Sequence, residues 1–241
     1  MKVIITGARG SMGRELRGLW QEKRPADELI LLNREDNDTL AAGLPKADVL
    51  VDFSGPGALD PILAFGRRTG TPLVMATTGY SEDERGRLKA CSEEVPVFYS
   101  ANYSLGIYVL KQLARLAAEY LPEADIEVVE MHHNRKKDAP SGTAHLLVEV
   151  LEEARGDQGR CYGRQGHQPR IPGEIGIHTV RGGTVTGEHT ILLALENERL
   201  ELVHRGESQR LFAAGALKAA VFMAGKSAGW YDMDDLMKGD L

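Results

Sequence analysis

The sequence predicts an α/β protein in two parts: a parallel sheet flanked by helices, then an α+β part with a mixed, largely antiparallel sheet. In the first hundred residues, short apolar runs alternate with helical segments, which is typical of a parallel sheet covered on both faces. A glycine-rich loop separates the first apolar run from the helix after it. Beyond residue 174, strand-like runs follow one another without intervening helices, which indicates antiparallel pairing.

The first part is expected to contain five strands. Each is a short run rich in β-branched and aliphatic residues. They cover Lys2–Thr6, Glu28–Leu32, Val49–Phe53, Leu73–Ala76 and Pro96–Tyr99. A helix is predicted over Met12–Gln21, and another after Ser81, because Glu84 three residues later completes a capping box.

The pattern changes after about Asn102. Helices are predicted over Ser104–Tyr120, from Ser141 to about Ala154, and over Arg210–Gly225, where apolar or small residues recur at helical spacing. The segment Gly156–Gly173 is polar and predicts a long loop. The expected strands are Ile126–Glu130, Ile175–Arg181, Glu188–Leu195 and Leu200–Arg205, with Asn197-Glu198 turning the last two into a hairpin.

Composition excludes several classes of protein. The 241 residues carry a net charge of −6, which disfavours nonspecific nucleic-acid binding. Cys91 and Cys161 are too few for a disulfide framework and fit a reducing compartment. No run approaches the roughly 18 apolar residues of a membrane span. We therefore expect a soluble, cytoplasmic protein with neither membrane nor nucleic-acid partners.

Gly7, Gly10 and Gly13 directly follow the first predicted strand and open a helix. In a dinucleotide-binding loop, such glycines make a tight turn, let the backbone approach the pyrophosphate, and allow close packing of helix and strand. The helix N-terminus then attracts phosphate through its unpaired N–H groups. The loop therefore predicts a Rossmann-like nucleotide-binding domain, the alternative being a glycine-rich turn without a ligand.

The residue about 20 positions past such a loop selects the cofactor. An acidic residue there accepts the ribose 2′-hydroxyl of NAD, whereas a neutral or basic site admits the 2′-phosphate of NADP. Asn33 and Arg34 occupy this place. The pair favours NADPH or the use of both cofactors, although Arg34 by itself is also compatible with a solvated surface residue.

A basic histidine cluster lies in the second part of the chain. His132, His133 and Lys136 precede the sequence Ser141-Gly142-Thr143, which opens a helix. Positive charge beside a helix N-terminus suits a small dianion, and a histidine or lysine there can transfer a proton. The alternative is a solvated basic loop followed by an ordinary helix cap.

Other chemistry finds little support in the sequence. Adjacent histidines rarely ligate one metal ion, and no cysteine or carboxylate stands at zinc-like spacing, so no metal site is expected. Ser141 lies outside a G-x-S-x-G motif, which argues against a hydrolase. His189 and His204 lie in strand-like runs and are expected to make structural hydrogen bonds.

The chain around this cluster resembles the 4-hydroxy-tetrahydrodipicolinate reductase (dihydrodipicolinate reductase) family. The string from Glu130 to Ala144 is similar to the family signature E-x-H-H-x-x-K-x-D-A-P-S-G-T-A. Shorter matches are spread over nearly the whole chain: Val51-Asp52-Phe53-Ser54, Thr77-Thr78-Gly79, Ala101-Asn102-Tyr103-Ser104, Arg181-Gly182-Gly183 with Gly187 and His189, and Phe212-Ala213-Ala214-Gly215-Ala216. Gln209 departs from the pattern, because an arginine often stands there in the family.

The resemblance implies particular roles for residues. His132 matches the family's proton donor and Lys136 its second catalytic residue. The implied substrate contacts are His133, Ser141, Gly142 and Thr143. The implied cofactor contacts are Gly7, Ala8, Arg9, Gly10, Ser11, Met12, Asn33, Arg34, Ala76, Thr77, Thr78, Ser100, Ala101, Asn102, Tyr103 and Phe212.

The resemblance also implies an activity and an organisation. The activity is the NADPH- or NADH-dependent reduction of 4-hydroxy-tetrahydrodipicolinate to tetrahydrodipicolinate, in the diaminopimelate route to lysine. Residues 1–102 and 212–241 are then expected to bind the dinucleotide. Residues 103–211 are expected to bind the dicarboxylate substrate and to build a homotetramer.

Three alternatives remain open on the sequence alone. A short-chain dehydrogenase fits the glycine loop but needs Tyr-x-x-x-Lys, and Lys111 follows Tyr108 by three residues rather than four. A non-catalytic nucleotide sensor would not need the basic histidine cluster. The third alternative is another two-domain dehydrogenase that acts on a dicarboxylate or an amino acid. Substrate screening would distinguish it from the reductase.

Overall fold

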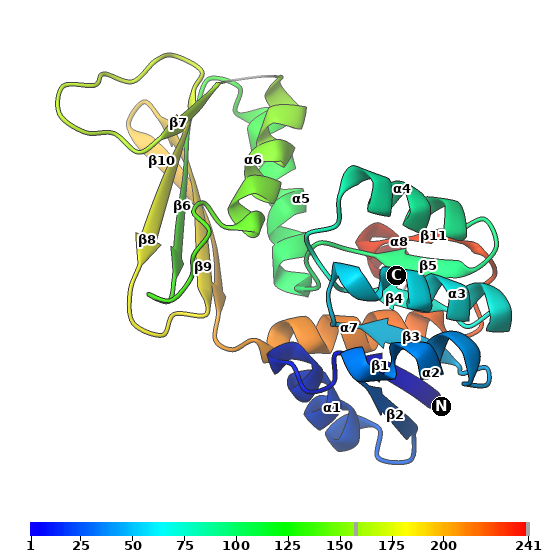
Figure 1. Cartoon of the computed structure of the whole chain (residues 1–241). Helices are drawn as coiled ribbons and strands as arrows, with labels where there is room; N and C mark the ends of the chain where they lie inside the picture. Colours follow the sequence, from blue (N-terminus) through cyan, green and yellow to red (C-terminus); the bar gives the residue numbers. More distant parts are fainter. Residues whose placement is uncertain (157–158, 240–241) are drawn as a thin grey trace. The chain divides into compact units, whose positions relative to one another are not determined.

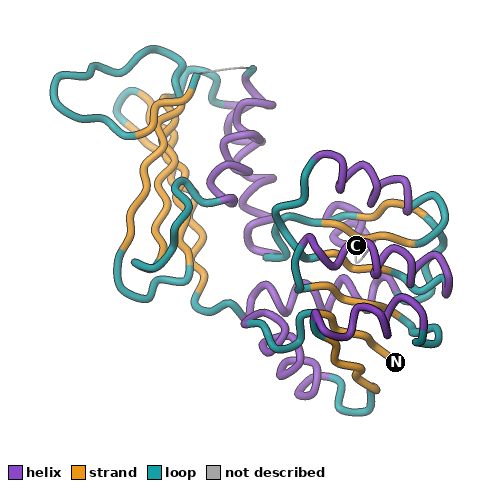
Figure 2. Tube along the Cα trace, viewed as in Figure 1, coloured by secondary structure: helices purple, strands orange, loops and turns teal. Residues whose placement is uncertain are grey.

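The computed structural model describes residues 1–156 and 159–239. The chain forms two compact units, which are described separately. Unit 1 comprises Met1–Ser104 and Gln209–Leu241, and unit 2 comprises Leu105–Ser208. Figure 2 shows helices and strands in both units. The last part of the chain therefore returns to the unit that the first part begins.

Unit 1 is built on a six-stranded parallel sheet with the order β11-β5-β4-β3-β1-β2 (Figure 1). Its strands are β1 (Lys2–Thr6), β2 (Glu28–Leu32), β3 (Val49–Asp52), β4 (Leu73–Met75), β5 (Pro96–Tyr99) and β11 (Gly229–Tyr231). The five strands predicted from the sequence are all present. The sixth, β11, was not predicted, because Gly229-Trp230-Tyr231 lacks the aliphatic run that marks the other strands.

Helices follow the strands of unit 1. They are α1 (Ser11–Lys23), α2 (Asn37–Ala42), α3 (Leu59–Thr69), α4 (Glu82–Cys91), α7 (Arg210–Met223) and α8 (Met233–Gly239), with short 3₁₀ turns η1 (Arg34–Asp36) and η2 (Pro56–Ala58). The capping box at α4 is confirmed, because Ser81 Oγ accepts from the Glu84 N–H and Glu84 accepts from the Ser81 N–H. Helix α3 was missed, because Pro56 and Pro61 around its start resemble a loop.

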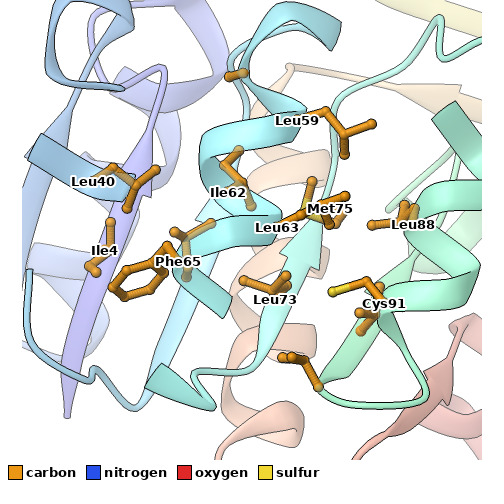
Figure 3. Close-up of a cluster of buried hydrophobic side chains, with 14 of the residues drawn as sticks. Ile4, Leu40, Leu59, Ile62, Leu63, Phe65, Leu73, Met75, Leu88 and Cys91 are labelled. Carbon is orange, nitrogen blue, oxygen red and sulfur yellow. The ribbon is translucent and has the colours of Figure 1, made fainter. Parts of the chain in front are cut away.

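The core of unit 1 lies between the sheet and helices α2, α3 and α4 (Figure 3). Ile4 and Leu73 from the sheet pack there with Leu63 and Phe65 of α3. On β1, Val3, Ile4 and Ile5 are all fully buried, although successive side chains of a strand point to opposite faces. Both faces of the sheet are therefore covered, as the alternating sequence predicted.

Unit 2 contains a five-stranded mixed sheet with the order β10-β9-β6-β8-β7. Its elements are α5 (Leu105–Tyr120), β6 (Asp125–His132), α6 (Gly142–Arg155), β7 (Arg160–Tyr162), β8 (Ile175–Arg181), β9 (Gly187–Leu195) and β10 (Glu198–Gly206). β9 is antiparallel to both β6 and β10, whereas β8 is parallel to β6 and to β7. Helices α5 and α6 pack against one face, where even-numbered residues of β6 are buried.

Two sequence predictions need correction. The segment Gly156–Gly173, whose residues 157–158 lie outside the described part, is not a continuous loop, because Arg160–Tyr162 pairs with β8. That strand is only three residues long and gives no alternating pattern. The hairpin turn also lies one residue earlier than predicted, because Glu198 already pairs with Leu195.

The hairpin turn gives a test of backbone conformation. Asn197 has a φ of 65°, in the left-handed region that a β-branched residue avoids. We expect Asn197→Val to lower the free energy of unfolding by about 1–2 kcal/mol. Asn197→Gly is the control and should leave it nearly unchanged. Urea unfolding followed by circular dichroism measures both, and equal stability of the two variants would contradict the role of this turn.

Candidate active site

The glycine loop of unit 1 is shaped by close backbone approaches. Gly7 has a φ of 71°, and a Cβ on it would lie 2.4 Å from the carbonyl oxygen of Phe53. A Cβ on Gly13 would lie 2.2 Å from the carbonyl oxygen of Gly7. Helix α1 therefore begins directly against the loop, with Gly10 as its N-cap and no acidic residue in its first turn. This leaves a helix N-terminus of the kind that binds phosphate.

Beside this loop lies a cavity of about 470 Å³. Of the predicted cofactor contacts, it brings together Gly7, Gly10, Asn33 and Arg34. It is lined in addition by a segment that the sequence reasoning did not assign to the site: Phe53, Ser54, Gly55, Pro56, Gly57 and Ala58, with Asn37. The available signal was Gly55-Pro56-Gly57, a glycine- and proline-rich turn directly after a predicted strand.

A buried carboxylate supports this segment. Asp52 is fully buried at the end of β3. It accepts hydrogen bonds from the Thr6 hydroxyl at 2.6 Å, the Ser54 hydroxyl at 2.5 Å and the Tyr80 hydroxyl at 3.3 Å. Asp52 thus joins the ends of β1 and β3 and fixes the start of the cavity wall.

Asn33 and Arg34 lie where the sequence predicts cofactor selection. The Asn33 side chain accepts a hydrogen bond from the Arg9 N–H at 2.9 Å, which connects it to the glycine loop. Arg34 is exposed in η1 and lines the cavity. Arg9 forms an ion pair with Glu35. The guanidinium groups of Arg9 and Arg34 therefore belong to the glycine loop and the cavity lining. Asn33, at the position that selects the cofactor, is not acidic.

The remaining predicted cofactor contacts lie outside the described lining of this cavity. Ala76, Thr77 and Thr78 follow β4, and Ser100, Ala101 and Asn102 follow β5, at the edge of the sheet where β1 ends in the glycine loop. Tyr103 is buried, and its hydroxyl donates to the Met75 carbonyl at 3.0 Å.

Phe212 stands in the first turn of α7. Ser11 donates through its hydroxyl to the side-chain oxygen of Gln209 at 2.7 Å, at the position where the sequence departs from the family pattern.

In unit 2, a buried glutamate organises the histidine cluster. Glu130 is fully buried on β6, and its carboxylate lies 2.5 Å from His132 Nδ1. Arg181, at the end of β8, donates to both carboxylate oxygens, at 2.9 and 2.8 Å. The Ser141 N–H, at the start of α6, donates to the same carboxylate at 3.1 Å. Three elements therefore meet at one side chain.

Burial and hydrogen bonding act in opposite directions on this pair. Burial by itself raises the pKa of Glu130, but the hydrogen bonds from Arg181 and His132 outweigh it and hold this pKa below the ordinary value. Burial also lowers the pKa of His132, although the Glu130 carboxylate raises it in part. Glu130 is therefore held as an anion, and the lowered pKa of His132 favours its neutral form more than in a free imidazole.

The start of α6 lies beside this pair. Ser141 is the N-cap, and its hydroxyl accepts from the Ala144 N–H at 3.1 Å. Gly142 and Thr143 form the first turn, at the positive end of the helix dipole. A carboxylate is a suitable ligand for such a helix end.

The two other predicted residues of this cluster lie in the turn after β6. The Lys136 N–H donates to the His133 carbonyl at 3.1 Å. Lys136 pairs with Asp138 at 2.9 Å, and its charge contributes to lowering the pKa of His132. Nδ1 of His133 is buried without a hydrogen-bond partner in the described structure. The turn therefore adds positive charge and an unpaired polar atom beside the buried pair.

His189 lies closer to the cluster than the sequence indicated. The expected structural hydrogen bond is present, since its Nε2 lies 3.2 Å from the Ser141 hydroxyl. Its ring also meets that of His132 edge to face, with centroids 5.2 Å apart. Burial, followed by the charge of His132, lowers the pKa of His189 to about 4. His189 was missed as a member of the cluster because β9 is distant in sequence and joins β6 only in the folded sheet.

The described residues contain neither a metal-binding cluster nor a membrane-spanning helix. Among residues 1–156 and 159–239, no group of three or more His, Cys, Asp or Glu side chains is placed to hold a metal ion. Within the same part of the chain, no helix has the length and apolar character needed to cross a membrane. Proton transfer by His132 and binding of an anion at α6 are the chemistry that these side chains support.

The glycine loop of a parallel-sheet unit, together with a buried histidine–carboxylate pair beside a helix N-terminus, defines a two-unit dinucleotide-dependent oxidoreductase. Comparison with known proteins specifies the family. Residues 1–103 match the family model for the N-terminus of dihydrodipicolinate reductase, and residues 106–237 match that for its C-terminus. The chain belongs to the dihydrodipicolinate reductase family.

Relatives agree with this assignment over the full length. The 4-hydroxy-tetrahydrodipicolinate reductase of Natronomonas pharaonis is 38% identical over 247 residues, covering 98% of this chain and 99% of the relative. That of Caldanaerobacter subterraneus is 40% identical over 250 residues, covering 99% and 98%.

Solved structures share the fold at lower identity. Dipicolinate-bound dihydrodipicolinate reductase from a Paenisporosarcina species matches with a TM-score of 0.76 and 21% identity, covering 96% of this chain and 97% of that one. The NAD complex of GenD2, from gentamicin A biosynthesis, matches with a TM-score of 0.58 and 13% identity, covering 93% and 86%. At these identities the likeness concerns the fold alone.

Because His189 is buried and its pKa is lowered, we expect the free energy of unfolding to fall in acid. Its pKa of about 4 lies below the ordinary 6.5, so above pH 6.5 it is neutral in both states. As pH falls from 6.5 to 4, the unfolded chain binds a proton that the folded one excludes. The free energy of unfolding should therefore fall by up to about 3 kcal/mol from this residue.

We expect His189→Phe to reduce the slope of stability against pH between 6.5 and 4, measured by urea unfolding at several pH values. His167→Gln is the matched control, because His167 is exposed. If both variants keep the wild-type slope, His189 is not responsible for it.

Proposed function

We propose that this protein catalyses the NADPH- or NADH-dependent reduction of 4-hydroxy-tetrahydrodipicolinate to tetrahydrodipicolinate, in the diaminopimelate route to lysine. Its membership of the dihydrodipicolinate reductase family over both halves of the chain carries this proposal. The relatives that match almost end to end bear the name of this reductase. The buried pair and the start of α6 supply the proton transfer and the anion binding that the reaction needs.

In unit 2, His132 is proposed to donate a proton to the substrate ring, and Lys136 to assist as the second catalytic residue. His133, Ser141, Gly142 and Thr143 are proposed to bind the substrate carboxylates. The position of Gly142 and Thr143 in the first turn of α6 supports this role. A positioned general acid contributes roughly 10²–10⁴-fold to the rate.

In unit 1, the cofactor is proposed to bind along the loop from Gly7 to Met12, with Asn33 and Arg34 at its ribose. Ala76–Thr78, Ser100–Tyr103 and Phe212 are proposed as further contacts. Gly7 and Gly13 let strand, loop and helix pack at distances that a Cβ would prevent. This close packing places the start of α1 at the loop and supports a bound pyrophosphate there. When bound, the reduced nicotinamide supplies the hydride.

A coupled assay tests the reaction. Purified synthase, pyruvate and aspartate semialdehyde generate the unstable substrate in place, and the absorbance of NADPH or NADH is followed. Oxidation that depends on both the synthase and this protein establishes the activity. If the cofactor binds without being oxidised, the substrate assignment is wrong, and a sensor or another dehydrogenase becomes the better hypothesis.

The proton donor is tested by replacing His132. We expect His132→Asn to lower kcat by about 10²–10⁴-fold, because the general acid is lost. The dissociation constant for NADPH, measured by fluorescence, should change little. His167→Asn, at an exposed position, is the control. Weaker cofactor binding with intact turnover would contradict this role.

Cofactor preference is tested at Arg34. We expect Arg34→Ala to raise KM for NADPH about tenfold and to leave KM for NADH unchanged, because only NADPH carries the 2′-phosphate. Arg17→Ala is the control, since Arg17 is equally exposed on α1 but does not line the cavity. An equal effect on both cofactors would show that Arg34 does not read the phosphate.

We also propose a cytoplasmic homotetramer assembled through the sheet of unit 2. The face of this sheet opposite α5 and α6 carries Val129, Met131 and Leu192, which are half-buried, and Val180 and Val203, which are exposed. These apolar side chains, which share the face with Glu127, Glu188 and Glu201, support an interface between copies. The two free, buried cysteines agree with a reducing compartment.

A further inference from the structure

The carboxylate of Glu130 has four protein nitrogen donors around it. One oxygen accepts from Ser141 N–H and one Arg181 nitrogen, at 3.1 and 2.8 Å. The other faces His132 Nδ1 and the second Arg181 nitrogen, at 2.5 and 2.9 Å. Since Arg181 binds in a bidentate manner and cannot release its proton in a protein, it keeps Glu130 as an anion that only accepts.

An anion that only accepts determines where His132 carries its proton. Nδ1 must donate to Glu130, so the neutral ring has its hydrogen on Nδ1 and its lone pair on Nε2. The opposite side of the ring faces Gly187, where a Cβ would lie 2.9 Å from Nε2. A side chain at position 187 would therefore crowd the nitrogen that must meet a substrate.

We propose that Glu130, clamped by Arg181, is a positioning residue that orients the His132 ring and keeps a hydrogen on Nδ1, so that Nε2 is the atom that transfers the proton. This inference rests on the proposed function of His132. In the step itself, the Nε2–H bond breaks as a bond from hydrogen to the substrate forms. The ring is left neutral with Nδ1–H still on Glu130, and solvent returns a proton to Nε2 before the next turnover.

The Glu130 carboxylate also fixes the distance between His132 and the first turn of α6, where the substrate carboxylate is proposed to bind. Glu130 holds His132 on one oxygen and the N–H of Ser141, the N-cap of α6, on the other. A substrate carboxylate at the first turn of α6 is thereby kept in register with Nε2. Loss of Glu130 should consequently affect the reaction step more than the binding of the cofactor in unit 1.

Glu130→Gln is a direct test, because it keeps the shape of the side chain. The Gln oxygen is expected to stay with Ser141 N–H and Arg181, since both are donors. Its NH₂ group then faces Nδ1 and donates to it, which forces the neutral His132 ring to carry its hydrogen on Nε2. Long-range ¹H–¹⁵N spectra of histidine-labelled full-length protein, assigned with His132→Asn, distinguish the two tautomers without any turnover.

Strand β6 offers a matched control in Glu127→Gln. Glu127 also accepts from a histidine, His178 at 2.7 Å, and from arginines, Arg164 at 2.8 Å and Arg170. It lies three residues before Glu130 and on the opposite face of the sheet. The control therefore removes a similar charged cluster from the same strand without touching His132.

In the coupled assay, we expect Glu130→Gln to lower kcat by about 100-fold, with the dissociation constant for NADPH unchanged. Its pH profile should shift as well. A general acid is active when protonated, so kcat/KM falls as pH rises through the pKa of His132. Removing the negative charge lowers that pKa, because Glu130 raises it whereas Lys136 and Arg181 lower it. The neighbouring His189 is unchanged in the variant, so the fall should move to lower pH.

The outcomes separate this inference from the proposed function. A wild-type tautomer and pH profile in Glu130→Gln overturn the positioning role, as does an equal loss of kcat in Glu127→Gln. If His132→Asn keeps full turnover, the proton donor is wrong, yet the spectra still report whether Glu130 sets the tautomer. Should Glu130→Gln fail to fold, Arg181→Lys keeps the charge but loses the bidentate contact. It should lower kcat about tenfold, and wild-type kinetics there overturn the clamp.

Discussion

The architecture of unit 2 depends on burying one carboxylate. An uncompensated buried charge is strongly destabilising, and Glu130 is fully buried. It is tolerated because Arg181 from β8, His132 from β6 and the Ser141 N–H at α6 all donate to it. The parallel pairing of β6 with β8 places His132 beside Arg181 and makes this possible. The charge that must be compensated is also the one that holds His132 through Nδ1.

The candidate site of unit 1 depends on close backbone packing rather than on paired charges, because glycines stand where a side chain would not fit. Gly7 and Gly13 allow loop, strand and helix to approach within distances that no Cβ would permit. Asp52 then ties the ends of β1 and β3 together beneath the cavity. In both units a helix begins at the candidate site, α1 at the glycine loop and α6 beside the Glu130–His132 pair.

Much of the fold could be predicted because its signals are local. The alternation of apolar runs predicted five of the six strands of unit 1, and Ser81 with Glu84 predicted the start of α4. The edge strands β7 and β11 were missed, since these three-residue strands contain no aliphatic run. In the site, Glu130, Ser141 and His189 were all visible in stretches that resemble the family. The place of His189 in the cluster was not predicted, because only the pairing of β9 with β6 brings it there.

The sequence alone determined the family, the order of the main elements and the residue types of both sites, because these depend on composition, spacing and motif over short stretches. The tertiary structure decided which charges meet. Arg181 lies 51 positions from Glu130, and His189 lies 48 from Ser141. No local pattern encodes such contacts, since strand register and the burial of both sheet faces create them. The tautomer of His132 is therefore a property of the folded sheet and cannot be read from the motif that contains it.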